Sequence, residues 1–339
     1  METFVLNIIA NSSLPILFMI IAIMLYTLSK GADLLVNEAV ALSEELGIPK
    51  MIIGATIVSL GTTLPEASVS VMASISGNSS LALGNAVGSV ICDTGLILGI
   101  AALISPLKIQ KDIVNRHGWI QFFAGLLLVI VSIPFTSLSH IFTNGGYISK
   151  SSGFLFIFLL IIYIYTSVRW TKNNKDENAV TVEFSGEIEN KFMILIKLIL
   201  GVVIIIISSK LLIPTVQETA IRLSVPNSVI AATLVAFGTS LPELVTSVTA
   251  SIKGHGELAI GNVIGADILN VLFVVGSAAA FSKEGIHVTP DFFKLYFPAM
   301  IFILTIFRLG TILSKDKLRR SFGLILLLTY VVISMLSYL

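Results

Sequence analysis

Long apolar stretches, each about as long as a bilayer is thick, alternate along the chain with short polar segments. A helix of about 20 apolar residues crosses the hydrocarbon core, so each stretch predicts one membrane-spanning helix. The stretches cover residues 14–29, 51–75, 81–105, 118–138, 152–170, 192–214, 228–252, 257–281, 292–313 and 321–339. The pattern therefore predicts an all-α polytopic membrane protein with ten transmembrane helices. We expect polar turns to extend the first and the sixth.

The composition excludes a water-soluble globular protein. Of the 339 residues, 55% are hydrophobic and 12% are charged, whereas about 25% are charged in an ordinary soluble domain. The 21 basic and 20 acidic residues leave a net charge of +1, too little to bind nucleic acid. A single cysteine, Cys92, excludes an internal disulfide. No basic residue precedes the first apolar stretch, so we do not expect a removable signal peptide.

Basic residues are concentrated in alternate connections between the apolar stretches. They follow the third stretch, flank the polar segment 171–190 and are placed after the ninth span: Lys108, Lys111, Arg116, Arg169, Lys172, Lys175, Lys191, Arg308, Lys315, Lys317, Arg319 and Arg320. Segments 76–80 and 134–149 carry none. Because cytoplasmic loops are rich in Lys and Arg, we expect 171–190 in the cytoplasm and both termini outside the plasma membrane. The short, mixed-charge segment 171–190 favours a tether over a regulatory element.

The chain contains an internal repeat. Residues 54–99 align without a gap on residues 231–276, with 21 identities in 46 pairs at a constant shift of 177. Five predicted spans separate the two copies, and an odd number inverts the second copy relative to the first. The sequence therefore predicts two inverted five-helix repeats, 1–170 and 191–339, joined by the cytoplasmic linker 171–190. Inverted repeats that meet at mid-membrane are typical of secondary transporters, although duplication can also simply enlarge a bundle.

Each copy of the repeat places a proline in the middle of an apolar span. The segments are GTTLPE, from Gly61 to Glu66, and GTSLPE, from Gly238 to Glu243. Proline removes a backbone donor, so we expect the helix to break near Gly61 and Gly238 and to free carbonyl groups there. The neighbouring hydroxyls belong to Thr62, Thr63, Thr239 and Ser240. Free carbonyls beside hydroxyls suit a cation, although Ser and Thr also repair ordinary proline kinks.

Acidic side chains lie in the same four spans. A carboxylate at the bilayer centre costs at least about 2.5–3.5 kcal/mol and therefore indicates a partner or a function. The acids are Glu66, Asp93, Glu243 and Asp267, and Asn270 occupies the position of Asp93 in the second copy of the repeat. The apolar interiors of these spans contain no Lys or Arg, so protons or bound cations must neutralise the carboxylates. Lys210, in the sixth span, is expected to extend to the surface.

The available ligand atoms favour a hard cation. Carboxylate, carbonyl and hydroxyl oxygens suit Ca2+ and Na+, whereas zinc or copper would require His or Cys. The four histidines, His117, His140, His255 and His287, are interpreted as solvated residues in or beside loops. The chain has no HExxH, GxSxG or phosphate-binding GxxxxGK[ST] sequence, so it lacks the motifs of a hydrolase or of an ATP-driven pump.

One pair of small-residue segments completes the repeat: GNAVG, from Gly84 to Gly88, and GNVIG, from Gly261 to Gly265. We expect their glycines to let helices approach closely, and Asn85 and Asn262 to hydrogen-bond between helices rather than to touch ions.

Together, GTTLPE with GNAVGSVICD and GTSLPE with GNVIGADILN resemble the paired alpha-repeats of the sodium/calcium exchanger family, within the cation/Ca2+ antiporter superfamily. The resemblance implies a diamond of four ion sites, no resident cofactor, and spans one and six as sliding gates. It implies that Glu66 and Glu243 are the central Ca2+ ligands, assisted by the carbonyls of Thr62 and Thr239. The implied Na+ ligands are Ser59, Thr63 and Ser89 on one side and Ala236 with Ser240 on the other.

The chain departs from the pattern of the resembling prokaryotic members at two places. They often carry Asn in the third span and Asp in the eighth, whereas here Asp93 and Asn270 exchange these residue types. The residue that matches Ser89 in the second repeat is Ala266, so one implied Na+ site lacks a hydroxyl, and Asp267 follows it. Asp267 is able to recruit a proton or K+, or to face a neighbouring helix in its protonated form.

The sequence therefore predicts a monomeric antiporter that exchanges Na+ for Ca2+ across the lipid bilayer by alternating access, and no enzyme activity. Three alternatives stay open: a H+/Ca2+ or K+-dependent exchanger, a cation channel, and a structural or receptor membrane protein.

Overall fold

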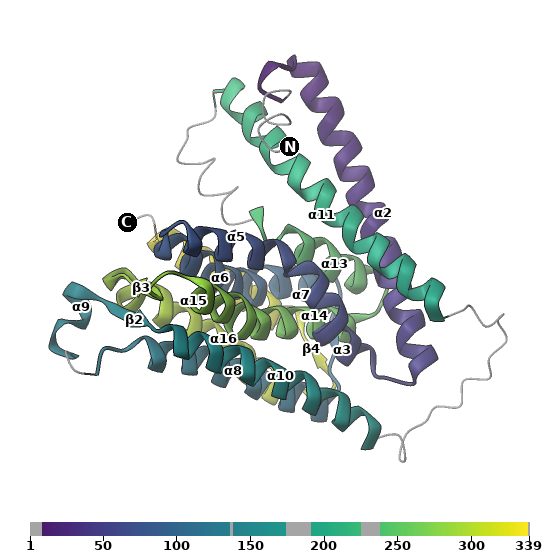
Figure 1. Cartoon of the computed structure of the whole chain (residues 1–339). Coiled ribbons are helices and arrows are strands. Elements are labelled where there is room, and N and C mark those ends of the chain that lie inside the picture. Colours follow the sequence, from purple (N-terminus) through teal and green to yellow (C-terminus); the bar gives the residue numbers. More distant parts are fainter. Residues whose placement is uncertain (1–8, 136–137, 174–190, 225–237, 338–339) are drawn as a thin grey trace.

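The computed structural model describes residues 9–135, 138–173, 191–224 and 238–337. Its apolar segments are helical, and in the first half of the chain two helical segments contain π-helical turns, at Gly54–Val58 and Asp93–Ile97. The helices of the first half are α2 (Leu14–Leu46), α3 (Lys50–Ile53), α4 (Ser59–Thr62), α5 (Leu64–Ile75), α6 (Ser79–Cys92), α7 (Leu98–Ile104), α8 (Lys111–Ser132), α9 (Ile141–Asn144) and α10 (Lys150–Asn173), with a short 3-10 turn at Leu138–His140 (Figure 1).

The second half has a matching order of elements. Its described helices are α11 (Lys191–Arg222), α13 (Leu241–Ile252), α14 (Gly256–Leu269), α15 (Gly276–Phe281), α16 (Phe297–Leu313) and α17 (Arg320–Leu336), with π-helical turns at Asn270–Val275 and Phe292–Tyr296. Helices α13 and α14 begin and end 177 residues after α5 and α6, respectively. The repeat in the sequence is therefore also a repeat of structural elements.

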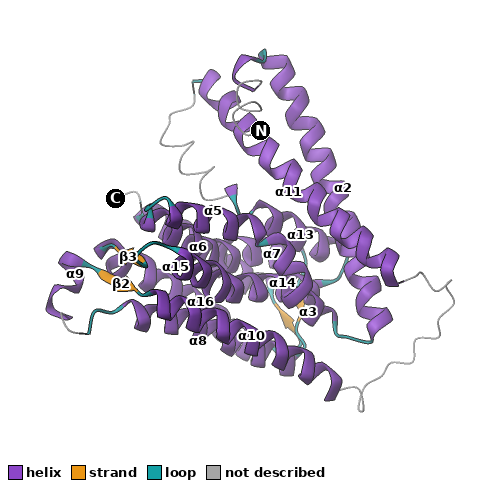
Figure 2. Ribbon diagram, in the orientation of Figure 1, coloured by secondary structure: helices purple, strands orange, loops and turns teal. Residues whose placement is uncertain are grey.

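Two very short antiparallel ladders are the strands in the described part of the chain (Figure 2). Strand β1 (Leu107–Lys108) pairs with β4 (Lys317–Leu318), and β2 (Gly146–Ile148) pairs with β3 (Ile286–Val288). Each ladder joins one connection from the first half to one from the second half. The connections after α7 and α16 thus meet at one end of the bundle, and those before α10 and α16 meet at the other.

Seven described helical segments are each long and apolar enough to cross a membrane, and the bent pair Lys50–Thr62 and Leu64–Ile75 makes up to eight. The sequence predicts ten spans. Two predicted spans are not among these eight. The tenth corresponds to α17, an apolar helix of 17 residues that is slightly too short to be counted. The seventh, 228–252, lies partly outside the described residues. The fold is that of an all-helical multi-pass membrane protein.

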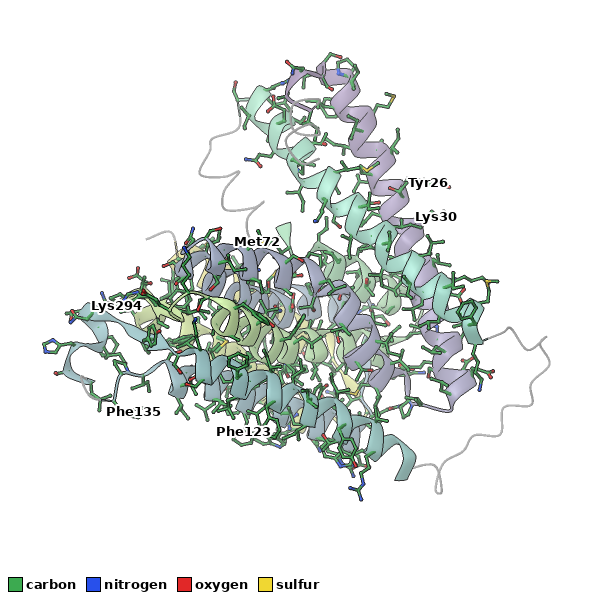
Figure 3. The ribbon with its side chains drawn as sticks, in the orientation of Figure 1. Tyr26, Lys30, Met72, Phe123, Phe135 and Lys294 are labelled. Carbon is green, nitrogen blue, oxygen red and sulfur yellow. The ribbon has the colours of Figure 1, made fainter. Side chains whose placement is uncertain are left out.

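The most buried segments are those that carry the repeated motifs. In the most apolar window of Gly256–Phe281, 94% of the residues are buried, against 28% in Lys150–Trp170. Large apolar side chains instead cover the outside of the bundle, including Met72 and Phe123, as Figure 3 shows. An apolar exterior around a core that contains acids is the arrangement expected of a protein surrounded by lipid.

Helices α2 and α11 form a closely packed pair that leans away from the rest of the bundle toward the start of α2 (Figure 1). They are longer than the apolar stretches 14–29 and 192–214, which confirms the predicted extension of spans one and six. Two ion pairs join them, Lys191 with Glu45 at 3.2 Å and Lys197 with Glu38 at 4.0 Å.

Candidate ion-binding site

The span that contains the first repeat breaks where its proline predicts. Helices α4 and α5 meet at Thr63, and the two arms of the span differ in direction by 47°. Pro65 has no N–H with which to bond the Gly61 carbonyl, so the regular helix cannot continue. The backbone of Ser240, before α13, has nearly the angles of Thr63, with φ and ψ of −82° and 10° against −83° and −3°. Residues 225–237, which precede Gly238, lie outside the described ranges.

The two glutamates occupy equivalent positions just after these breaks. Glu66 and Glu243 lie in the first turns of α5 and α13, and their exposed fractions are 0% and 1%. The positive end of a helix dipole stabilises a carboxylate at this position. The Thr63 hydroxyl donates a hydrogen bond of 3.1 Å to Glu243 Oε1. The break in one repeat thus contacts the glutamate of the other.

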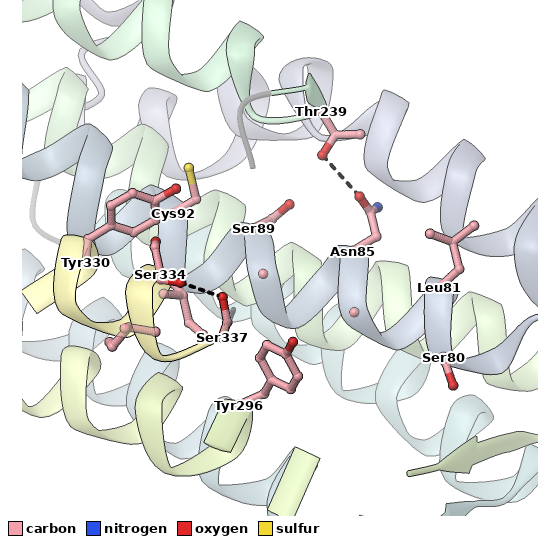
Figure 4. A pocket seen from close by; sticks show the side chains of 14 residues that line it. Ser80, Leu81, Asn85, Ser89, Cys92, Thr239, Tyr296, Tyr330, Ser334 and Ser337 are labelled. Carbon is pink, nitrogen blue, oxygen red and sulfur yellow. Dashed lines mark hydrogen bonds between the residues drawn. The ribbon is translucent and has the colours of Figure 1, made fainter. Parts of the chain in front are cut away.

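A buried amide connects the same two regions. Asn85 Nδ2 donates to the Glu66 carbonyl at 3.2 Å and to Ser70 Oγ at 3.0 Å. Its Oδ1 accepts a hydrogen bond of 3.1 Å from the Thr239 hydroxyl, drawn in Figure 4. In the second repeat Asn262 Nδ2 makes the equivalent bond to Ser247 Oγ at 3.1 Å. The prediction that Asn85 and Asn262 hydrogen-bond between helices is confirmed.

A second pair of hydrogen bonds joins the repeats reciprocally. The Ser74 hydroxyl donates to the Ala278 carbonyl, and the Ser251 hydroxyl donates to the Ala101 carbonyl, both at 2.7 Å. Each donor and each acceptor has its counterpart at the shift of 177 residues. The two halves therefore contact each other through like elements.

Asp93 and Asn270 each begin a π-helical turn. The side chains of Asp93 and Asn270 are buried. Within the described structure, their polar atoms make no hydrogen bond. The Ser240 hydroxyl faces Asp93. Both carboxylate oxygens of Glu66 are in the same condition. Single π-turns inside α-helices occur frequently at functional sites. Buried carboxylates without donors are the atoms that a bound cation would satisfy.

Asp267 is held differently. Its Oδ2 accepts hydrogen bonds of 2.5 Å from the Thr94 hydroxyl and from Gln121 Nε2. Gln121 belongs to α8, outside the repeated motif, and sequence reasoning missed it. The available signal was a glutamine within the apolar stretch 118–138.

Of the hydroxyls named as candidate ligands, those of Ser59 and Thr62 lie in α4, next to the break, and that of Ser89 lies in α6. Ser59, Thr62 and Ser89 are all buried. The Ser59 and Thr62 hydroxyls bond back to the carbonyls of Thr56 and Ser59, at 3.4 Å and 3.3 Å. Ser240 is buried next to Glu243's helix, whereas Ala236 lies outside the described residues.

Basic side chains do not neutralise these acids: none of the ion pairs within the described ranges involves Glu66, Asp93, Glu243 or Asp267. Nor do any three His, Cys, Asp or Glu side chains of those ranges lie close enough to hold a metal by themselves. A cation here would thus need carbonyl, amide or hydroxyl ligands besides the carboxylates.

Two interpretations of the sequence are wrong. His117 is not a solvated loop residue: it is buried in α8, and its Nδ1 lies 3.0 Å from the Tyr163 hydroxyl, because α8 begins earlier than the apolar stretch. Arg308 does not follow the ninth span. It is buried within α16, donates to the Val114 carbonyl and Asn115 Oδ1, both at 3.2 Å, and stacks on Trp119.

His255, in the connection before α14, is half-buried, with Nδ1 3.4 Å from Lys50 Nζ. Burial and the Lys50 charge lower the pKa of His255. Lys210 is exposed on α11, as expected.

The repeat-related glycines differ in how tightly they are packed. A Cβ on Gly265 would lie 2.5 Å from both the Ala55 carbonyl oxygen and Ser59 Oγ. A Cβ on its repeat-mate Gly88 would meet nothing within 4 Å. Close approach is therefore confirmed at Gly265 but not at Gly88.

Gly88 instead borders a cavity of about 310 Å3 (Figure 4). The cavity is lined by residues of α6 between Ser80 and Cys92, by residues between Tyr330 and Ser337, and by Thr239. Its lining includes Ser89, Asn85 and Tyr330. Two candidate ligands, Ser89 and Thr239, thus face open space.

A multi-pass bundle with buried, unneutralised carboxylates at paired helix breaks defines a protein that transports ions through a membrane. Comparison with known proteins agrees. The family model described as sodium/calcium exchanger protein matches residues 16–169 and 193–339. The chain belongs to this family, whose members are transporters rather than enzymes.

Relatives and solved structures of this family are similar over nearly the whole chain. The sodium/calcium exchanger MaX1 of Methanosarcina acetivorans is 31% identical, over 93% of this chain and 96% of its own. The inner membrane protein YrbG of Escherichia coli is 31% identical, over 82% and 83%. A structure of the sodium-calcium exchanger NCX_Mj soaked with Na+ and Sr2+ superposes with a TM-score of 0.79 at 25% identity, covering 96% of this chain and 100% of that one.

Proposed function

We propose that the protein is a secondary-active antiporter that exchanges Na+ for Ca2+ at a site formed by Glu66 and Glu243. The observation that carries the proposal is the Thr63–Glu243 hydrogen bond, which joins the helix break of the first repeat to the buried glutamate of the second. Na+ entering down its gradient would displace Ca2+ from these shared carboxylates. The ions would then occupy the site in turn, and each occupancy would favour one access state.

We assign the ligands by motif and geometry. Ca2+ takes six to eight oxygen ligands, often with bidentate carboxylates. The Glu66 and Glu243 carboxylates would supply the charge, and the Thr62 and Thr239 carbonyls would add neutral oxygens. The flanking Na+ ligands would be Ser59, Thr63 and Ser89 on one side and Ala236 with Ser240 on the other. Asp93, Asn270 and Asp267 would border the same space.

We also propose ten spans in two inverted five-helix repeats, 1–170 and 191–339, with 171–190 as linker. The recurrence of α5 and α6 as α13 and α14 at a constant shift supports the repeat. The reciprocal Ser74 and Ser251 hydrogen bonds support a two-fold relation between the halves. The apolar helix α17 supports a tenth span.

The proposed orientation puts both termini outside the plasma membrane and 171–190 in the cytoplasm. The β1–β4 ladder supports it, because it brings together connections rich in Lys and Arg, including Lys108 and Lys317. The β2–β3 ladder joins the connections that would lie outside. We propose a monomer, because each site would be complete within one chain.

Flux into proteoliposomes tests the exchange, with Na+, K+ and pH gradients imposed one at a time. We expect Ca2+ uptake driven by an outward Na+ gradient. Uptake driven only by a pH gradient would instead indicate a H+/Ca2+ exchanger, and current without any counter-ion gradient would indicate a channel.

Acidification should inhibit the exchange. Protons and cations compete for the same carboxylates, so apparent Ca2+ affinity should fall as the pH is lowered. Raising the Ca2+ concentration should restore the rate, which initial-rate measurements at several pH values would check. Inhibition that saturating Ca2+ does not relieve would contradict competition at the site.

The cavity beside α6 should admit reagents from the outside. In a Cys92→Ser background, we expect Ser334→Cys protein to react with a membrane-impermeant thiol reagent applied to the outside, and Ser132→Cys protein, buried in α8, to stay unmodified. Labelling read by mass spectrometry checks this. Modification of both cysteines alike, or of neither, would contradict an outward-facing cavity.

A further inference from the structure

A polar cluster forms where α8 meets the segments that carry the site. Gln121 of α8 is 2% exposed, and its Nε2 bonds both Asp267 Oδ2, at 2.5 Å, and Thr94 Oγ1, at 3.3 Å. Thr94 also donates to the same Asp267 oxygen. Residues from α8, α14 and the π-helical turn at Asp93–Ile97 therefore converge on one carboxylate.

The other oxygens of this cluster lack donors. Asp267 Oδ1, Gln121 Oε1 and both Asp93 oxygens are buried without a hydrogen bond within the described ranges. Asp93 directly precedes Thr94, whose hydroxyl donates to Asp267. A buried acceptor without a donor costs about 1–3 kcal/mol, and more if it is charged. Two carboxylates and an amide oxygen in that condition suit a bound cation.

The chemistry of the second repeat agrees. Ala266 occupies the position of Ser89 and supplies no hydroxyl, while the next residue, Asp267, supplies a carboxylate. Gln121 fixes the orientation of that carboxylate through Oδ2 and leaves Oδ1 and its own Oε1 available. Asp267 Oδ1 and Gln121 Oε1 thus supply oxygen atoms in a repeat where Ala266 supplies none.

Within the exchange function proposed above, we propose that Asp267, Gln121 and Asp93 form a further subsite for one monovalent cation, Na+ or K+, beside the Glu66–Glu243 pair. The four available oxygens are too few for the six to eight ligands that Ca2+ prefers. They suit a smaller charge with fewer ligands. Gln121 brings a helix outside the repeat into ion binding.

Two measurements test the subsite. The first is binding of radiolabelled Na+, of Rb+ as an analogue of K+, and of Ca2+ to the purified full-length protein. The second is Ca2+ uptake into proteoliposomes as a function of Na+ concentration. The variants are Asp267→Asn, which keeps the side-chain shape, and Gln121→Leu. Gln110→Leu, an exposed residue before α8, is the matched control. We expect both cluster variants to bind one Na+ or Rb+ fewer than the unmodified protein. The Hill coefficient for Na+ should fall if the subsite binds Na+, and the stimulation of uptake by K+ should fall if it binds K+. The Ca2+ affinity should stay near that of the unmodified protein and the control.

Na+ and Rb+ binding unchanged in both variants would overturn the subsite. Loss of Ca2+ binding in parallel with monovalent binding would also overturn it, because it would indicate a structural role. So would a change confined to the pH profile, which would indicate a bound proton. Failure of the exchange function is distinguishable, since the unmodified protein would then show no Ca2+ uptake driven by Na+, while the binding measurements would still report on the subsite.

Discussion

Replacing Glu66 or Glu243 by glutamine is expected to abolish Ca2+ uptake driven by a Na+ gradient. Each substitution keeps the shape of the side chain but removes a charge that no basic residue of the described chain offsets. We expect Ca2+ affinity to fall by at least about 100-fold, which corresponds to about 3 kcal/mol. Initial uptake rates in Na+-loaded proteoliposomes, with Ca2+ binding measured on the same preparations, check this result.

The matched control is Glu284→Gln, an exposed acid in the connection before β3. It should transport at the unmodified rate. Full uptake by either Glu66→Gln or Glu243→Gln protein would exclude a mechanism in which both carboxylates bind the transported ions.

Adding one methyl group to Gly265 should have the second largest effect. The new Cβ would lie 2.5 Å from the Ala55 carbonyl oxygen, a backbone atom that cannot move aside cheaply, and from Ser59 Oγ. Overpacking of this kind costs about 1–3 kcal/mol or more. Gly265→Ala should therefore lower the thermal stability of the purified protein and displace Ser59, so that transport also falls.

Gly88→Ala provides the control, because Gly88 is the repeat-mate of Gly265 and its added Cβ would meet nothing within 4 Å. We expect near-normal stability and flux. Equal destabilisation by the two substitutions, measured by thermal unfolding, would contradict the difference in packing between the two halves.

The repeat in the sequence predicted much of what positions the site. The prolines predicted a break that lies at Thr63, and the gap-free alignment predicted the matching bounds of α5 with α13 and of α6 with α14. These features follow from local chemistry, since proline acts on its own turn. The identity of the acids could be read directly from the chain.

Contacts between distant segments could not be predicted in this way. The Thr63–Glu243 bond joins residues 180 apart, and the Gln121–Asp267 bond joins residues 146 apart. The π-helical turns at Asp93 and Asn270 could not be predicted either, because they do not change the spacing of hydrophobic residues along the chain. His117 and Arg308 were misplaced because a polar residue near the end of an apolar stretch can lie in the loop or continue the helix, and only packing decides between them.

The most direct test of the central claim is competition between the two transported ions at equilibrium. Radiolabelled Ca2+ bound to the purified protein is titrated with Na+ at fixed pH and ionic strength. We expect Na+ to displace Ca2+ completely, with the apparent Ca2+ affinity falling steeply as the Na+ concentration rises. Ca2+ that Glu66→Gln protein still binds at higher Ca2+ concentration should not be displaced by Na+. Ca2+ that stays bound to the unmodified protein at saturating Na+ would contradict the claim that the ions share the Glu66 and Glu243 carboxylates.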